Sequence, residues 1–162
     1  MQNLINDDDN LRNVLKNAVF DDNINAITGY SANVKSLYGK GYALLGNAGE
    51  FLDPVFSSGV TIAMKSASLA AAILDRQFKG DVVDWQNEYA LPLQSGVDTF
   101  RVYVDAWYDG RFQDAIFHPK QQPEVKAMIC SILAGYAWDK SNPYVKNARS
   151  RLDTLVELCR AG

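Results

Sequence analysis

The chain has 162 residues, of which 48% are hydrophobic and 22% are charged, and its formal net charge is -3. This balance argues against a disordered chain and against a nucleic-acid surface, which needs clustered lysine and arginine. Two cysteines, Cys130 and Cys159, are too few for a disulfide framework, and no apolar run has the length of a membrane span. The N-terminus has no secretion-signal pattern. We therefore expect a single domain over residues 1–162, located in the cytoplasm.

The first third of the chain predicts only short elements. Apolar side chains recur at helical spacing in one segment, and three others have the residue types of short strands. The expected elements are a helix over residues 10–18 and strands over residues 23–27, 32–34 and 42–45. So few strands would form only a small remnant of a sheet, within residues 22–60.

The remainder of the chain predicts helices. They are expected from Ser57 or Ser58 to Phe78, over residues 81–109 with an interruption at Pro92, over residues 123–134, and after Asn142-Pro143. In the first of these, five apolar residues recur at helical spacing: Val60, Met64, Ala67, Ala71 and Leu74. The expected fold class is mostly α with a small β remnant, an α/β fragment with its helical region in residues 58–162.

A stripe of aromatic residues follows the helix predicted over residues 81–109. Its members are Trp85, Tyr89, Phe100, Tyr103, Trp107 and Tyr108. Core packing is the favoured interpretation, and a role in lining a substrate cavity or an interface is the alternative. His118 is the only histidine, without cysteine or carboxylate partners at metal-ligand spacing, so no metal site is expected.

Residues 46–60 join the end of an apolar run to the start of a long helix through Gly, Pro and Ser. Backbone N–H groups at a helix start favour an anion or an electron-rich ring. Asp53-Pro54 fixes the backbone just before the helix entrance. Asn47 follows a strand end, where it is either a turn residue or a ligand of a sugar hydroxyl.

The segment from Asp53 to Val60 reads Asp-Pro-Val-Phe-Ser-Ser-Gly-Val. It strongly resembles the flavin-contacting motif in the C-terminal portion of FAD-dependent oxidoreductases of the para-hydroxybenzoate hydroxylase-like fold. The resemblance is strongest to flavin-dependent (tryptophan) halogenases and halogenase-like dehydrogenases, and it continues more loosely through residues 100–103 and 134–136. It implies the helical part of an FAD/NAD(P)-binding-type flavoprotein fold.

By this resemblance, eight residues are expected to contact FAD: Gly46, Asn47, Asp53, Pro54, Ser57, Ser58, Gly59 and Val60. Asn47 replaces an aspartate that binds a ribose hydroxyl in the family. Pro54 is expected beside the isoalloxazine ring, with the N–H groups of Gly59 and Val60 at its pyrimidine edge. No catalytic side chain is assigned.

Several parts of the family pattern have no counterpart in this sequence. They are the Gly-x-Gly-x-x-Gly pyrophosphate fingerprint, the halogenase catalytic lysine and the Trp-x-Trp-x-Ile-Pro motif. Phe56 stands where halogenases of free tryptophan carry a glutamate. The expected function is therefore that of a C-terminal fragment of an FAD-dependent monooxygenase, halogenase-like enzyme or dehydrogenase, whose partners are the absent N-terminal FAD-binding region and an organic small-molecule substrate.

A second hypothesis comes from a different class of protein. The chain is then a non-enzymatic helical interaction module that kept the fold and lost the cofactor. Whether it is an enzyme stays open at this point, and we expect the isolated chain to be inactive. Removal of a nucleotide-binding domain leaves apolar surface uncovered, which favours self-association.

Overall fold

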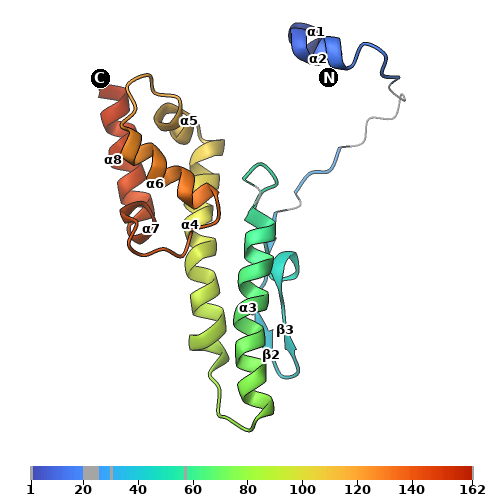
Figure 1. Ribbon diagram of the computed structural model, residues 1–162, viewed down its shortest axis with the longest axis vertical. Coiled ribbons are helices and arrows are strands. Elements are labelled where there is room, and N and C mark those ends of the chain that lie inside the picture. Colours follow the sequence, from blue (N-terminus) through green and yellow to red (C-terminus); the bar gives the residue numbers. More distant parts are fainter. Residues whose placement is uncertain (1, 20–25, 30, 57, 162) are drawn as a thin grey trace.

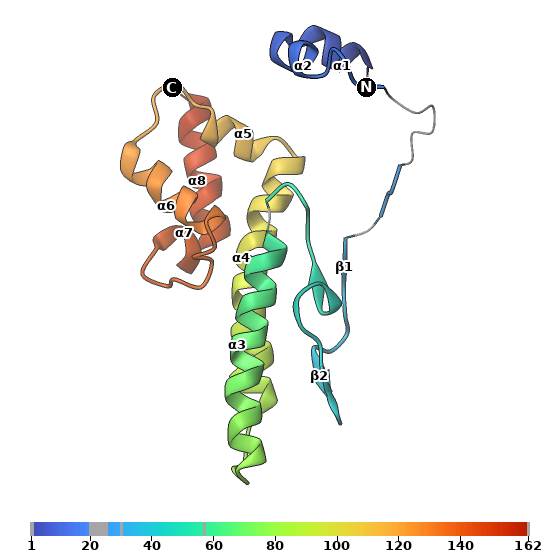
Figure 2. The ribbon, with the colours of Figure 1, turned by 45° about the vertical axis from the view of Figure 1, so that its right-hand side comes forward.

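The structure is a computed structural model, which describes residues 2–19, 26–29, 31–56 and 58–161. Two long helices, α3 (Ser58–Phe78) and α4 (Leu91–Tyr108), lie side by side at its centre (Figures 1 and 2). Short strands lie along α3, and the later helices gather beside one half of α4. The chain is mostly helical, as the sequence predicted.

Two short helices begin the chain, α1 (Gln2–Asp7) and α2 (Asp9–Val14), and they contact each other. Asp8 caps α2 because its side chain accepts a hydrogen bond of 2.9 Å from the N–H of Leu11. The helix predicted over residues 10–18 thus begins earlier and ends at Val14. No residue of α2 is buried, so its apolar side chains face solvent.

Four two-residue strands follow: β1 (Ala32–Asn33), β2 (Tyr38–Gly39), β3 (Tyr42–Ala43) and β4 (Glu50–Phe51). β1 pairs antiparallel with β4, and β2 pairs antiparallel with β3 in a hairpin. Gly41 turns this hairpin at a φ of 84°, which favours glycine. Of the strand predicted over residues 23–27, only Ala26 and Ile27 lie among the described residues, and they are in no strand.

Helix α3 buries a stripe of small and branched residues, not the apolar stripe seen in the sequence. The buried residues are Ser58, Ile62, Ser66, Ala70 and Ile73. They pack against the 3₁₀ turn η1 (Gly46–Ala48) and against α4. Val60 and Met64 of the other stripe are 71% and 70% exposed. The apolar spacing therefore predicted a helix correctly but did not identify its buried side.

A π-helical turn, η2 (Gln86–Ala90), leads into α4. Pro92 lies in the first turn of α4, where its missing N–H leaves no hydrogen bond unmade. The helix predicted over residues 81–109 thus begins later, at Trp85, and its geometry changes from π to α just before Pro92, where an interruption was expected. Tyr89, Phe100 and Tyr103 of the aromatic stripe are buried in the core. This placement supports the core-packing interpretation for these three residues.

The last helices are α5 (Arg111–Ile116), α6 (Pro123–Leu133), α7 (Pro143–Lys146) and α8 (Ala148–Ala161). They form a cluster beside the C-terminal half of α4 (Figure 2). Asn142 caps α7 by accepting a hydrogen bond of 2.9 Å from the N–H of Tyr144. Helix α5 was not predicted. Gly110, with a φ of 87°, turns the chain between α4 and α5.

Trp138 fastens the loop after α6 to α4. Its ring lies directly over Gly96, where an added Cβ atom would come within 2.0 Å of the indole. The indole Nε1–H donates a hydrogen bond of 2.8 Å to the carbonyl oxygen of Pro92. The ring also meets Phe100 edge to face, with centroids 6.1 Å apart. The absence of a side chain at Gly96 is thus what allows this contact.

We expect Gly96→Ala to destabilise the protein, although alanine is the better helix former by about 1 kcal/mol. The new methyl group displaces the indole, and overpacking of this kind costs about 1–3 kcal/mol. The difference is a net loss of up to about 2 kcal/mol, which should appear in urea unfolding. Asp98→Ala, on the exposed side of the same helix, is the control and should change stability by less than about 0.5 kcal/mol. Equal effects of the two substitutions would contradict the assignment.

Candidate functional site

An open hollow of about 780 Å³ lies where η1, the loop after β4 and the start of α3 meet. Six of the residues predicted to contact a cofactor line it: Gly46, Asn47, Asp53, Pro54, Gly59 and Val60. Ser58 is buried at the same end of α3, 2% exposed. Ser57 lies outside the described residues. The structure thus brings the predicted residues together, and their role in binding stays a prediction.

Gly46 allows η1 to lie against α3. Its φ is 53°, and an added Cβ atom would come within 2.9 Å of the Cβ atom of Ala63. The N–H of Gly46 donates a hydrogen bond of 3.0 Å to the hydroxyl of Ser66, which donates in turn to the carbonyl oxygen of Ala63 at 2.9 Å. A buried hydroxyl therefore satisfies a buried backbone N–H.

Tyr89 extends this polar junction from the π-helical turn. Its hydroxyl donates a hydrogen bond of 2.5 Å to the carbonyl oxygen of Leu44, which directly precedes the hollow. Burial raises the pKa of the Tyr89 hydroxyl, and an interaction with Ser66 offsets part of that rise. The hydroxyl therefore remains a protonated donor at neutral pH. Residues 44–46 are in this way held against α3 by side chains from two elements.

Ser66→Ala should destabilise the protein, because the N–H of Gly46 would remain buried without an acceptor. Such a loss costs about 1–3 kcal/mol. The matched control is Ser68→Ala on the exposed side of the same helix, for which we expect less than about 0.5 kcal/mol. Chemical denaturation of both variants measures the difference. If the two serines prove equivalent, the hydroxyl of Ser66 does not hold η1 in place.

Asn47 and Gly59 lie next to each other in the lining of the hollow. An added Cβ atom on Gly59 would lie 3.2 Å from the side-chain oxygen Oδ1 of Asn47. The amide of Asn47 is thus exposed beside the first turn of α3, where helix N–H groups have no intrahelical acceptor. Pro54 and Val60 are also exposed at this edge. An amide, helix N–H groups and apolar surface are therefore available together to one ligand.

Asp53 shapes the loop from within. It is 5% exposed, and its Oδ1 atom accepts a hydrogen bond of 2.6 Å from the N–H of Val55. Its Oδ2 atom accepts a hydrogen bond from the hydroxyl of Tyr108 at the end of α4. Both carboxylate oxygens are therefore engaged inside the protein. Asp53 fixes the position of Pro54 and the helix entrance.

A second buried carboxylate also ties this region to α4, and the sequence did not reveal it. The side chain of Glu50 in β4 is 5% exposed and forms an ion pair of 2.7 Å with Arg101. The two residues are far apart in the chain, so no local pattern predicts the contact. Loss of the arginine would leave the buried carboxylate charge uncompensated, which strongly destabilises a folded protein. The pair therefore fixes the strand that leads into the loop.

Phe56 packs into an aromatic corner. Its ring meets Trp107 edge to face, with centroids 5.8 Å apart, and lies 5.9 Å from the ring of Phe112. The loop before α3 is therefore attached to the junction between α4 and α5. Phe56 supplies apolar contact here and no acid–base chemistry.

Other functional groups stand apart from the hollow. His118 lies after α5, where its Nδ1 atom accepts a hydrogen bond of 3.3 Å from the N–H of Lys120. Within the part of the chain that the structure describes, no three His, Cys, Asp or Glu residues are placed to hold a metal ion.

In the same residues, no helix combines the length and the hydropathy required to cross a bilayer.

Known proteins with similar sequences are halogenases. The chain is 45% identical over 69 residues to a tryptophan 2-halogenase from Chondromyces crocatus, a match that covers 43% of this chain and 13% of that protein. It is 32% identical over 85 residues to a flavin-dependent halogenase from Metacordyceps chlamydosporia, which covers 51% of this chain and 16% of that protein. No protein-family model matches the chain.

A solved structure is similar along most of the chain. It is a flavoprotein/dehydrogenase from Cytophaga hutchinsonii, 45% identical, with a TM-score of 0.80. The match covers 83% of this chain and 33% of that one, so the present chain spans only about a third of its structural neighbour. The chain is therefore similar to one part of much longer proteins, namely flavin-dependent halogenases and a flavoprotein/dehydrogenase.

Proposed function

We propose that the chain supplies the wall of an FAD site that faces the isoalloxazine ring and the ribose, as the C-terminal part of an FAD-dependent oxidoreductase. The observation that carries this proposal is the hollow at the start of α3, where Asn47, Pro54 and the first helical turn converge. The flavin would supply the redox chemistry of the whole enzyme, which oxidises an organic small molecule by hydroxylation, dehydrogenation or halogenation.

The residues of the hollow fit this cofactor. The amide of Asn47 offers both a donor and an acceptor to a ribose hydroxyl. The N–H groups of Gly59 and Val60 suit the electron-rich pyrimidine edge of the ring, and the helix dipole favours negative charge there. Gly59 carries no side chain between these N–H groups and a ligand. Pro54 offers a rigid apolar surface to the ring.

The exposed stripe of α3 supports a further part of the proposal. It consists of Val60, Met64, Ala67, Ala71 and Leu74. An apolar stripe of this extent on a soluble helix requires a cover, and the matched relatives are several times longer than the matched segments. We propose that an N-terminal FAD-binding region covers it in the whole protein. Residues 1–162 then act as one domain that is inactive alone.

Titration of the chain with FAD tests the proposal. Ala67 is exposed and lines the hollow, so Ala67→Trp places an indole in the space intended for the flavin. We expect saturable FAD binding, followed by flavin fluorescence, and at least a tenfold weaker affinity for Ala67→Trp. A tenfold change corresponds to about 1.4 kcal/mol.

The control is Ala72→Trp, an equally exposed alanine of α3 outside the hollow. This variant should bind FAD as the unchanged chain does. Equal losses in both variants would overturn the assigned position of the flavin. No saturation up to about 1 mM FAD, where the binding energy is only about 4 kcal/mol, would instead favour the non-enzymatic helical module.

Without its covering region, the chain should associate with itself through the exposed stripe. Light scattering at micromolar concentration is expected to give a dimer or larger species, and Met64→Lys should shift it toward the monomer. Lys126→Ala, a change on the exposed side of α6, serves as the control. A monodisperse monomer before any substitution would contradict the expectation.

The free thiols of Cys130 and Cys159 support a cytoplasmic location.

A further inference from the structure

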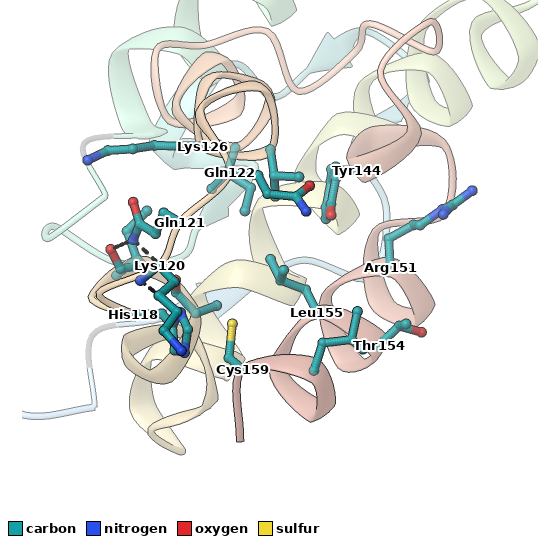
Figure 3. A pocket seen from close by; sticks show the side chains of 15 residues that line it. His118, Lys120, Gln121, Gln122, Lys126, Tyr144, Arg151, Thr154, Leu155 and Cys159 are labelled. Carbon is teal, nitrogen blue, oxygen red and sulfur yellow. Dashed lines mark hydrogen bonds between the residues drawn. The ribbon is translucent and has the colours of Figure 1, made fainter. Parts of the chain in front are cut away.

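A second hollow, of about 260 Å³, lies among α5, α6, α7 and α8 and the loop between α5 and α6 (Figure 3). It shares no lining residue with the hollow at the start of α3. Its volume suits a small molecule of one or two rings or a short aliphatic chain. Neither the flavin proposal nor the covering of α3 makes use of it.

The inner part of this hollow is apolar. Ile129 and Ala115 are 1% and 5% exposed and form its base. Val125, Leu155 and Leu158 line its walls. Leu158 remains 67% exposed at the rim, although it is large and apolar. A hydrocarbon group placed here would remove this surface from water.

The lining carries positive charge without a carboxylate. Lys120, Lys126 and Arg151 belong to it, and no aspartate or glutamate does. This is unusual for a chain with 19 acidic and 16 basic residues. The local charge therefore favours an anion, and the favourable field extends over about 10 Å at moderate salt.

Two carboxylates adjacent in the chain to lining residues, Asp114 and Asp153, are paired with other cations, whereas Glu124 and Glu157 are in no ion pair among the described residues. Asp114 forms an ion pair of 2.7 Å with Arg160, and Asp153 forms one with Arg111. In the described part of the chain, neither Lys120 nor Arg151 forms an ion pair. Their charges are consequently available to a ligand.

Figure 3 shows how the charged and apolar groups are arranged. Lys126 and Arg151 lie on opposite sides of the hollow, with their charged ends turned outward. Leu155 and Cys159 lie between them. Burial raises the pKa of the Cys159 thiol, with a further contribution from Asp114, so the thiol is neutral near pH 7. Positive charge thus lies at the rim and apolar, uncharged groups lie inside.

We propose that this hollow binds a small apolar monocarboxylate, with its hydrocarbon part against Ile129 and Leu155 and its carboxylate at the rim near Arg151. The flexible stem of Arg151 allows its guanidinium group to turn toward the carboxylate, and the lysines on the opposite side add positive charge at longer range. A neutral molecule of the same shape would gain the apolar contact alone. The charge is therefore what distinguishes the proposed ligand.

Alkylation of the two cysteines gives the first test. Cys159 lines the hollow, whereas Cys130 is exposed on α6 outside it. 2-Naphthoate should slow the reaction of Cys159 with iodoacetamide at least threefold and leave Cys130 unchanged, as measured by mass spectrometry of the peptides. 2-Naphthamide, the neutral analogue, should protect Cys159 about tenfold less effectively at equal concentration. Equal protection by acid and amide, or none by either, would overturn the proposal.

A pair of variants at the rim tests the charge separately. Leu158→Asp and Leu158→Asn both replace the exposed leucine by a polar group of similar size, and only the first adds negative charge. Leu158→Asp should weaken 2-naphthoate binding at least threefold relative to Leu158→Asn, with the amide affected equally by both. Arg151→Gln should weaken the acid about twofold to threefold, and Lys140→Gln, outside the hollow, should not. If the acid binds equally to both Leu158 variants, the rim does not select an anion.

Discussion

The hydroxyl of Ser66 is the constraint on which the arrangement of the hollow at the start of α3 depends. It is completely buried, accepts from the N–H of Gly46 and donates to α3 itself. Because Gly46 lacks a side chain, η1 lies close enough for that bond to form. Tyr89 holds Leu44, two residues before Gly46, through a hydrogen bond to its carbonyl oxygen. A serine in the middle of a helix, usually a neutral choice, here determines where the strands end.

The residues around this junction divide α3 into two functional sides. Its buried side has small residues that admit the backbone of η1, together with two isoleucines, and its exposed side has larger apolar residues interspersed with alanines. The loop between β4 and α3 is fixed independently, by Glu50 on Arg101 and by Asp53 on Tyr108. Two acidic side chains thus attach the loop to α4. The turn η1 packs separately against α3. The hollow lies between these two attachments, and its position is set by both.

Local patterns predicted the helices α3 and α6, the restart at Pro92 and the cap at Asn142, because each depends on residues within a few positions of one another. The motif over residues 46–60 also predicted which residues would gather at the start of α3. Contacts between distant residues were not predictable in this way. The Glu50–Arg101 ion pair and the contact of Trp138 with α4 depend on tertiary packing. Tertiary packing also determines which side of α3 is buried.

The aromatic corner around Phe56 limits which side chains the loop before α3 can accept at this position. The resemblance to halogenases of free tryptophan places a glutamate at this position. A glutamate placed here by one substitution would set a carboxylate beside Trp107 and Phe112, where desolvation of the charge is unfavourable. The substitution would weaken the fold before it could contribute chemistry, so a carboxylate at this position requires compensating changes at the neighbouring rings. Packing around a single side chain thus limits which chemistry the loop can acquire.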